Sequence, residues 1–248
     1  MLKEAIEKIE AMSTKPEVKA IDGHNYIFDK DGAYTEIKPD IKTPENLTLN
    51  SLGALVQMVK REALPMFGDD KYPLFINVPQ HNLAEVFTAQ VPEDRFNRPY
   101  LYSARATDIP GWDEQTALAF DQAAVALQTR FAPSSDLEYT LALLSQITTG
   151  AKVTYADNGV ATSIVTQKGI SLQQNQTIKP IVKLRPYRTF QEVEQPEGLF
   201  LIRINERGIT FTEADGGMWK LTARKTVAAY LSEALAEEIE AGSVVVTI

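Results

Sequence analysis

The sequence predicts an α+β fold with mainly antiparallel sheet, packed helices and an antiparallel pair of helices in the middle of the chain. Short alternating segments are separated by turn residues, as in antiparallel hairpins. Two segments with helical spacing follow near the middle and are joined by only Ala-Pro-Ser-Ser, which favours an antiparallel pair. Helices and strands do not alternate regularly, as they would in a doubly wound fold.

The first half of the chain is expected to contain two helices and two groups of strands. Tight-turn signals at Asp22-Gly23 and Asp31-Gly32 predict a small antiparallel meander. The expected segments are, in order, a helix ending near Pro16, a meander over 18–38, a linker over 38–49, a helix over 52–59 capped by Asn50 or Ser51, and strands at 74–78, 83–89 and 98–106.

The second half is expected to contain the helix pair, further strands and a last helix. The expected segments are a helix capped by Asp113 and running to Phe131, a helix from Ser134 or Ser135 to Gly150, a hairpin over 152–167 turning at Asn158-Gly159, strands at 181–184, 199–204 and 209–213, a helix capped by Thr222 and an apolar tail at 244–248. We expect an N-terminal α+β part over 1–110 and a C-terminal part over 111–248, or one integrated domain.

Composition limits the function classes. The 248 residues are 44% hydrophobic and 23% charged, with a formal net charge of −8, which is typical of a globular protein. This charge disfavours direct contact with nucleic acid or anionic membranes. The absence of cysteine excludes disulfides and thiolate chemistry. The charged N-terminus and the lack of a long apolar run predict a cytoplasmic protein without a signal peptide or membrane span.

Motifs that carry chemistry are missing from the sequence. The two histidines, His24 and His81, are far apart and offer no metal-ligand spacing, and there is no Gly-x-Ser-x-Gly elbow. Phosphate-binding glycine loops are also absent. We therefore predict no catalytic residues, no metal and no cofactor. An enzyme that assembles carboxylates in space remains an open alternative.

Arg98, Tyr100 and Tyr102 form the first candidate binding site. In a strand these three side chains would share one face, where arginine and tyrosine can stack on a ring and hold an anion. The alternative is that the tyrosines pack beneath a helix and Arg98 lies at the rim.

Arg185, Tyr187 and Arg188 form the second candidate site, in a proline-bounded stretch between two strands. As a loop, this stretch would contact an anion or nucleotide through its arginines. The alternative is that the arginines pair with Glu192 and Glu194, and that the prolines stiffen a crossover.

The same stretch carries a resemblance to an uncharacterised family of proteins encoded by phages and prophages. The resemblance covers about the last two-thirds of the chain, and its arrangement is similar to that of Yfd-type prophage proteins. It rests on four segments, residues 154–159, 186–196, 199–203 and 213–221. It implies a phage or prophage origin and action inside an infected bacterium, but it implies no catalytic residues. Gly216-Gly217 and Trp219 in the last segment are expected to be structural.

Three hypotheses of function follow. The first is a non-enzymatic protein, expected to form a homo-oligomer, that binds a small anionic, nucleotide-like ligand or a host or phage protein, with counter-defence as one such role. The second is an accessory factor in phage DNA replication or recombination, acting through another protein. The third is a virion structural or assembly protein.

Overall fold

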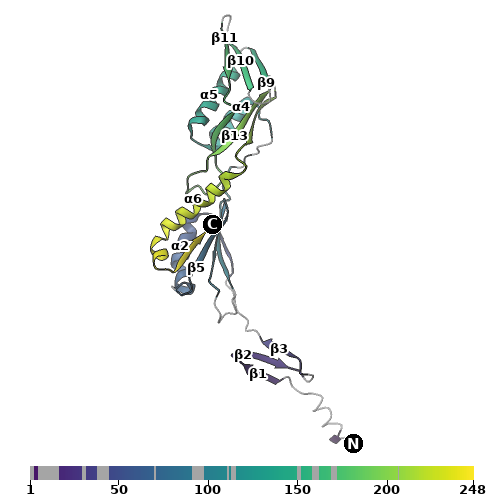
Figure 1. Ribbon diagram of the computed structural model, residues 1–248, viewed down its shortest axis with the longest axis vertical. Helices are drawn as coiled ribbons and strands as arrows, with labels where there is room; N and C mark the ends of the chain where they lie inside the picture. Colours follow the sequence, from purple (N-terminus) through teal and green to yellow (C-terminus); the bar gives the residue numbers. More distant parts are fainter. Residues whose placement is uncertain are drawn as a thin grey trace. The chain divides into compact units, whose positions relative to one another are not determined.

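The chain forms two compact units, Met1–Thr43 and Pro44–Ile248. Figure 1 traces the helices and mostly antiparallel strands along the chain, which confirm the predicted α+β class. The division expected at residue 110 stays a prediction. The computed structural model describes residues 3–4, 17–29, 32–37, 45–69, 71–90, 98–110, 112, 116–149, 152–157, 162–168, 172–205 and 207–248.

The first unit contains the predicted meander. Its strands β1 (Glu17–Ile21), β2 (His24–Phe28) and β3 (Tyr34–Ile37) are antiparallel and lie in chain order. Asp22 and Gly23 both have positive φ, 51° and 82°, which a tight turn of the type I′ class requires. Of the expected opening helix, only residues 3–4 are described, and they are helical; the rest lies outside the described residues.

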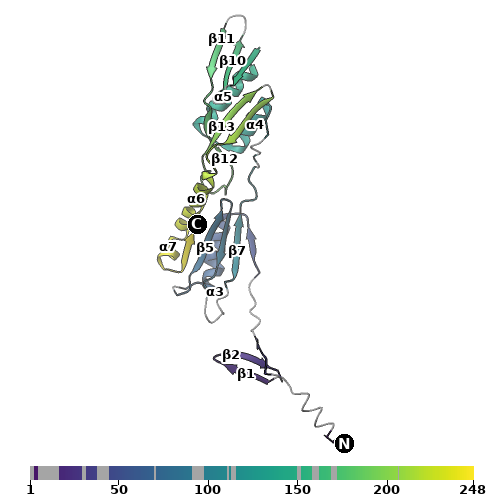
Figure 2. The same cartoon turned by 45° about the vertical axis from the view of Figure 1, so that its right-hand side comes forward.

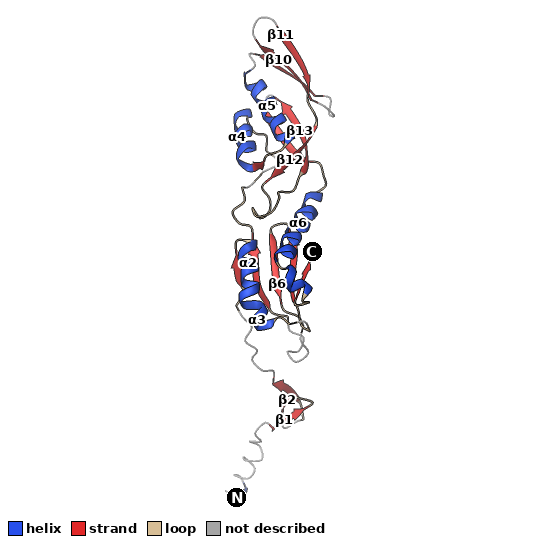
Figure 3. Cartoon of the chain, turned by 90° about the vertical axis from the view of Figure 1, so that its left-hand side faces the viewer, coloured by secondary structure: helices blue, strands red, loops and turns tan. Residues whose placement is uncertain are grey.

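A five-stranded sheet in the second unit carries helices on one face. Its elements are β4 (Leu47–Leu49), α2 (Leu52–Met58), η1 (Val59–Ala63), α3 (Leu64–Phe67), β5 (Leu74–Gln80), β6 (Leu83–Phe87), β7 (Tyr100–Arg105), α6 (Met218–Ala234), α7 (Ala236–Glu240) and β15 (Val244–Thr247). The strand order is β15-β5-β6-β7-β4, with parallel pairing only at the two edges. Figure 2 shows the strands in front, whereas Figure 3, from the other side, shows α2 and α6 in front.

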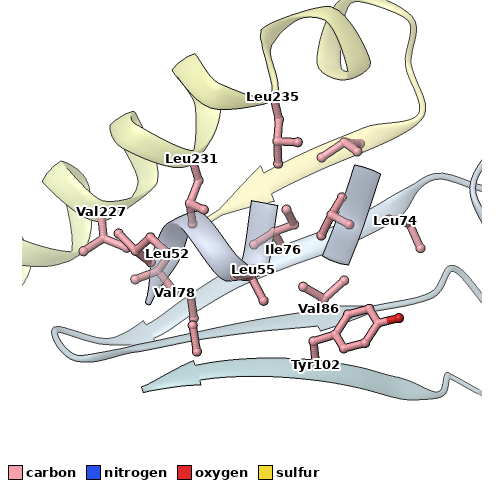
Figure 4. Close-up of a cluster of buried hydrophobic side chains, with 14 of the residues drawn as sticks. Leu52, Leu55, Leu74, Ile76, Val78, Val86, Tyr102, Val227, Leu231 and Leu235 are labelled. Carbon is pink, nitrogen blue, oxygen red and sulfur yellow. The ribbon is translucent and has the colours of Figure 1, made fainter. Parts of the chain in front are cut away.

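The helices and the sheet enclose the first hydrophobic core (Figure 4). On α6, Trp219, Ala223, Val227 and Leu231 recur every four residues and so form one buried stripe. Of these, Val227 and Leu231 belong to the first core, together with apolar residues of the strands and of α2. Each fully buried large aliphatic side chain contributes about 1.5–3 kcal/mol to folding. The fully buried residues labelled in the figure are Leu52, Leu55, Leu74, Ile76, Val78, Val86, Val227, Leu231 and Leu235.

Segments α2, η1 and α3 form one continuous helical stretch with a π turn in its middle. The π turn covers Val59–Ala63 and ends just before Pro65, which lies in the first turn of α3. Proline has no N–H for the hydrogen bond of an α-helix, and its ring crowds the preceding turn. A wider turn before Pro65 therefore lets the helix continue without a sharp break.

A second sheet has its own hydrophobic core. Its elements are α4 (Phe120–Arg130), β8 (Phe131–Ala132), α5 (Ser135–Thr149), β12 (Ile181–Pro186), β13 (Gly198–Asn205) and β14 (Gly208–Glu213). The strand order is β14-β13-β12-β8, and α4 and α5 pack on each other beside it. At Gly208, with φ at 135°, a Cβ would lie 1.9 Å from the Leu118 carbonyl oxygen, so only glycine fits there. Three further strands, β9 (Lys152–Asp157), β10 (Thr162–Lys168) and β11 (Leu172–Thr177), form a separate antiparallel sheet.

Several predicted elements differ from the structure. The expected linker over 38–49 contains β4, because Leu47–Leu49 pairs in parallel with β7, a contact that local sequence does not reveal. The last long helix begins at Met218 after Gly217, which adopts a left-handed conformation, so Thr222 lies inside the helix rather than at its cap. The helix α4 begins at Phe120, and the expected cap Asp113 lies outside the described residues. The tail at 244–248 contains a strand, β15.

Residues 187–197, between β12 and β13, link the two cores. Phe190 is 1% exposed and belongs to the first core, although the strands on either side belong to the second sheet. The Gln195 side chain organises the loop: its Oε1 accepts the Arg188 and Thr189 N–H groups, and its Nε2 donates to the Phe190 carbonyl. We call this segment the linking loop.

Glu192 of the linking loop caps α2 from a distant point in the sequence. One carboxylate oxygen accepts the Leu52 N–H at 2.8 Å and lies 3.5 Å from the Gly53 nitrogen, while Ser51 Oγ accepts the Ala54 N–H. The negative charge also interacts favourably with the N-terminal end of the helix dipole. The linking loop is thereby tied to the first helix of the second unit.

We expect Glu192→Ala to lower the free energy of unfolding by about 1 kcal/mol, the usual value of a helix cap. Glu194→Ala is the matched control, because Glu194 is 71% exposed and its pairing with Arg185 is worth less. Urea denaturation followed by circular dichroism measures both. Equal losses in the two variants would contradict this role of Glu192.

Candidate functional site

The face of the five-stranded sheet opposite the helices carries an in-register apolar row. Val245 pairs with Phe75, Phe75 with Phe87, and Phe87 with Tyr100, across four neighbouring strands. Their neighbours Ile76 and Val86 are buried in the core, so these side chains lie on the opposite face. We call this surface the open face and these four residues the apolar row. The strands of this face lie in front in Figure 2.

A second, polar row runs beside the apolar row. It crosses all five strands and consists of Thr247, Asn77, Glu85, Ser103 and Thr48. Three contacts hold it: Thr247 Oγ1 lies 3.3 Å from Asn77 Oδ1, Ser103 Oγ lies 3.4 Å from Thr48 Oγ1, and the Tyr100 hydroxyl lies 3.5 Å from Glu85 Oε1. The open face therefore carries rings along one line and polar residues along the next, of which Ser103 is buried.

Arg98 and Tyr100, two residues of the first candidate site, lie at this face. The Arg98 guanidinium is 5.2 Å from the centre of the Phe75 ring, within the range of a cation–π contact. The Tyr100 and Phe87 rings are 5.1 Å apart. Because Arg98 precedes Tyr100 and Ser103 follows it along β7, Arg98 lies on the side of the apolar row away from the polar row. A positive charge, a line of rings and a line of polar residues therefore lie in this order across the open face.

Tyr102 does not share this face, contrary to the prediction. The register between β6 and β7 shifts between Val86 and Phe87, which pair with Tyr102 and Tyr100, so Leu101 is an extra residue. At such a β-bulge the alternation of side chains is interrupted. Both Leu101 and Tyr102 consequently point into the first core, and Tyr102 is 5% exposed. Burial and a hydrogen bond with Glu62 raise the pKa of Tyr102 to about 12.

The residues of the second candidate site contact the chain's own groups. Arg185 Nη1 lies 2.6 Å from a Glu194 carboxylate oxygen, and its Nε lies 3.8 Å from Glu197. The Tyr187 N–H donates to the Arg130 carbonyl at 3.0 Å. The proposed pairing of Arg185 with Glu194 is thus present, whereas Arg188 pairs with Glu213 and Glu192 caps α2.

Arg188 is the centre of a buried cluster where the linking loop meets α6. It is 7% exposed and forms an ion pair with Glu213. Its guanidinium carbon lies 4.2 Å from the centre of the Trp219 ring and 5.0 Å from that of Phe200. These contacts of Arg188 with two rings and a carboxylate fix the linking loop in place.

His81 completes this cluster from the β5–β6 turn. Its ring meets the Trp219 ring edge-on with centres 4.8 Å apart, and its carbonyl accepts a hydrogen bond from the Thr189 hydroxyl. Burial, and then the positive charges of Lys220 and Arg188, lower the pKa of His81. Neutral His81 is therefore the form that the folded protein favours.

The first unit also exposes rings. Tyr26, Phe28 and Tyr34 lie on one face of the meander, with centres 5.7 Å apart for Tyr26 and Tyr34 and 5.8 Å for Phe28 and Tyr34. Together with Ile21 they line a shallow cavity of about 310 Å³. Tyr34 is 67% exposed. Exposed apolar groups of this kind are typical of surfaces that contact other macromolecules.

The sequence analysis missed Phe75, Phe87 and Glu85. Their strands were predicted, and the alternation in Leu74–Val78 and Leu83–Phe87 already separates buried from outward positions. The outward positions of the strands at 74–78, 83–89 and 98–106 point to Phe75, Phe87 and Tyr100, but not to Val245, whose strand was not predicted. Their common register could not be read, because it depends on the β-bulge at Leu101.

Comparisons with known proteins add no relative: no protein-family model, curated protein or solved structure matches this chain. In the part of the chain that the structure describes, no group of three or more acidic or histidine side chains is placed to hold a metal ion. Within the same residues, no helix combines the length and apolar character that crossing a bilayer requires.

We expect Arg188→Ala to lower the free energy of unfolding by about 3–5 kcal/mol, because it leaves the Glu213 carboxylate without this buried cation and removes the guanidinium that packs on Trp219. Arg185→Ala is the control, since exposed ion pairs contribute about 0–1 kcal/mol. Chemical denaturation of both variants measures the difference. Similar losses would show that Arg188 does not hold the loop.

The lowered pKa of His81 makes stability depend on pH. Below its ordinary value of 6.5, the unfolded chain binds a proton at His81 that the folded protein resists, so the free energy of unfolding falls as pH falls through this region. We expect His81→Gln to reduce this fall between about pH 7.5 and pH 5.5. His24→Gln, in the other unit, is the control. Denaturation curves at both pH values decide, and an unchanged pH dependence in His81→Gln would contradict the assignment.

Proposed function

We propose that this protein is a non-enzymatic binding protein whose open face takes a nucleotide-like anion. The observation that carries the proposal is the apolar row, with Arg98 on one side and the polar row on the other. A flat base would stack on Phe87 and Tyr100, as bases do on aromatic platforms. Its polar edge would meet Glu85 and Asn77, and its phosphate would meet Arg98.

The two candidate arginine groups differ in what they offer a ligand. Arg185 and Arg188 contact Glu194 and Glu213 of the same chain, and Arg188 is buried. Arg98 is exposed, and its described contact is with a ring rather than a carboxylate. An incoming phosphate would therefore meet a guanidinium at the open face without displacing an acidic partner seen in the structure. This difference favours the open face as the binding surface.

The net charge of −8 and the presence of Glu85 favour a small ligand over a nucleic acid strand. A strand would bring many phosphates close to an acidic protein, whereas one nucleotide needs a single cation. We also propose a phage or prophage origin, as the resemblance implies, with the ligand encountered in the cytoplasm of an infected bacterium. Nucleotide signals of the host are ligands of the right chemistry.

Calorimetric titration with nucleoside monophosphates, triphosphates and cyclic nucleotides tests the proposal. We expect binding by at least one of them, and a loss of affinity of about tenfold or more in Phe87→Ala, because stacking on one ring is worth about 1–3 kcal/mol. Val125→Ala on the exposed side of α4 is the matched control. A folded protein that gives no heat with the whole panel would exclude this function.

A host or phage protein as partner is a second candidate, favoured by the exposed rings of the meander. In this case the nucleotide panel gives no heat, and Tyr34→Lys in the full chain abolishes binding to a partner protein of host or phage. Phe87→Ala is then the control that keeps binding. Loss of binding in Phe87→Ala but not in Tyr34→Lys would argue against the meander.

A further inference from the structure

The strand β15 closes one edge of the five-stranded sheet and leaves its outer side available for pairing. It runs parallel to β5, with Val244 beside Leu74 and Thr247 beside Asn77. In the described sheet, β15 is the terminal strand of the order β15-β5-β6-β7-β4. Val245 is 37% exposed and Ile248, the next residue after the strand, is 49% exposed.

The direction of the backbone groups on β15 follows from one hydrogen bond. The Ser243 carbonyl accepts the Leu74 N–H at 2.9 Å. In a parallel ladder every second residue turns its N–H and C=O to the same neighbour, so Val245 and Thr247 also face β5. Val244 and Val246 consequently present their N–H and C=O groups to the outer side of the strand.

The sequence of β15 has no charged residue or proline that would protect this edge. Natural edge strands are commonly protected by charged residues, proline or a very short length. The strand Val244–Thr247 is Val-Val-Val-Thr, with neither a charge nor a proline. The β14 edge, by contrast, is contacted by Leu118, which exchanges backbone hydrogen bonds with Ile209.

We propose that β15 pairs antiparallel with β15 of a second copy of this chain, about a two-fold axis at Val246. In this register the two Val246 residues exchange both backbone hydrogen bonds, and Val244 lies opposite Ile248 of the other copy. The two five-stranded sheets become one continuous sheet. On the open face, the apolar row of each copy then meets the polar row of the other copy, with Val245 opposite Thr247 of the second copy.

A second copy fits this edge because the strand is complementary to itself. Valine meets valine and isoleucine in the paired register, and such β-branched pairs are favourable between strands. No like charges are brought together on the strand, since β15 has none. A two-fold axis also closes the assembly, so that both open edges are consumed in one dimer. This interaction does not depend on the ligand proposed for the open face.

A single introduced cysteine tests the register directly, because the chain has no cysteine of its own. In Val246→Cys the two Cα atoms would lie about 5.5 Å apart across the axis, within the range of a disulfide. We expect a cross-linked dimer on mild oxidation. Val125→Cys, at a 60% exposed position on α4, is the control and is expected to form no disulfide cross-link under the same oxidising conditions and at the same concentration. Equal cross-linking in both variants would overturn the proposal.

The association itself is measured by sedimentation of the full chain without cysteine. We expect a dimer at about 10 μM, which corresponds to a Kd in the micromolar range or below. Val246→Pro removes an outward N–H but no hydrogen bond to β5, and it is expected to weaken association at least tenfold. Val246→Thr keeps the N–H and is the matched control. A native chain that is monomeric at about 100 μM, or a folded Val246→Pro variant that dimerises like Val246→Thr, refutes the proposal. If Val246→Pro fails to fold, the comparison of cross-linking in Val246→Cys and Val125→Cys decides.

Discussion

The buried Arg188 contacts the rings of Trp219 and Phe200 and forms an ion pair with Glu213, and these contacts hold together three segments of the second unit. It joins the linking loop to β13, β14 and α6, which carry residues of both hydrophobic cores. A buried guanidinium is costly unless its charge and its flat faces are both occupied. Here Glu213 supplies the opposite charge and the two rings supply aromatic contacts, so the same residue that imposes a cost also defines how the segments are arranged.

Because the buried guanidinium is engaged in contacts within the protein, a cation that can bind a ligand has to be found at the surface. The most buried arginine is a structural residue, while Arg98, near the rings of the open face, is exposed. The helices occupy one side of the sheet and leave the other side as a broad amphipathic surface. The fold thus separates the residues that hold it together from those available for recognition.

Much of the fold could be predicted from local patterns. The meander followed from its turns, α5 from its capping serines and apolar spacing, and the hairpin β13–β14 from alternating apolar residues. The parallel strands β4 and β15 could not be predicted, because their partners lie far away in the sequence and no turn announces them. Parallel pairing leaves no local signature of this kind.

The candidate site was predicted in part. Arg98 and Tyr100 were found from residue type, and the ion pair of Arg185 with Glu194 was weighed as an alternative. Tyr102 was assigned to the wrong face, because Leu101 interrupts the period of two. Glu213, the partner of Arg188, lies in another strand, and electrostatic pairing over such a distance depends on the tertiary fold rather than on spacing.

The two cores also differ in how the chain supplies them. The second core is built from one continuous stretch, between Trp112 and Phe211, whereas the first combines residues near Leu52 with Leu235 and Val244. During synthesis on the ribosome, the second core can therefore complete its packing before strand β15 of the five-stranded sheet has been made. Until β15 emerges, the β5 edge is bare, and this is the stage at which a chaperone would be most useful to the nascent chain.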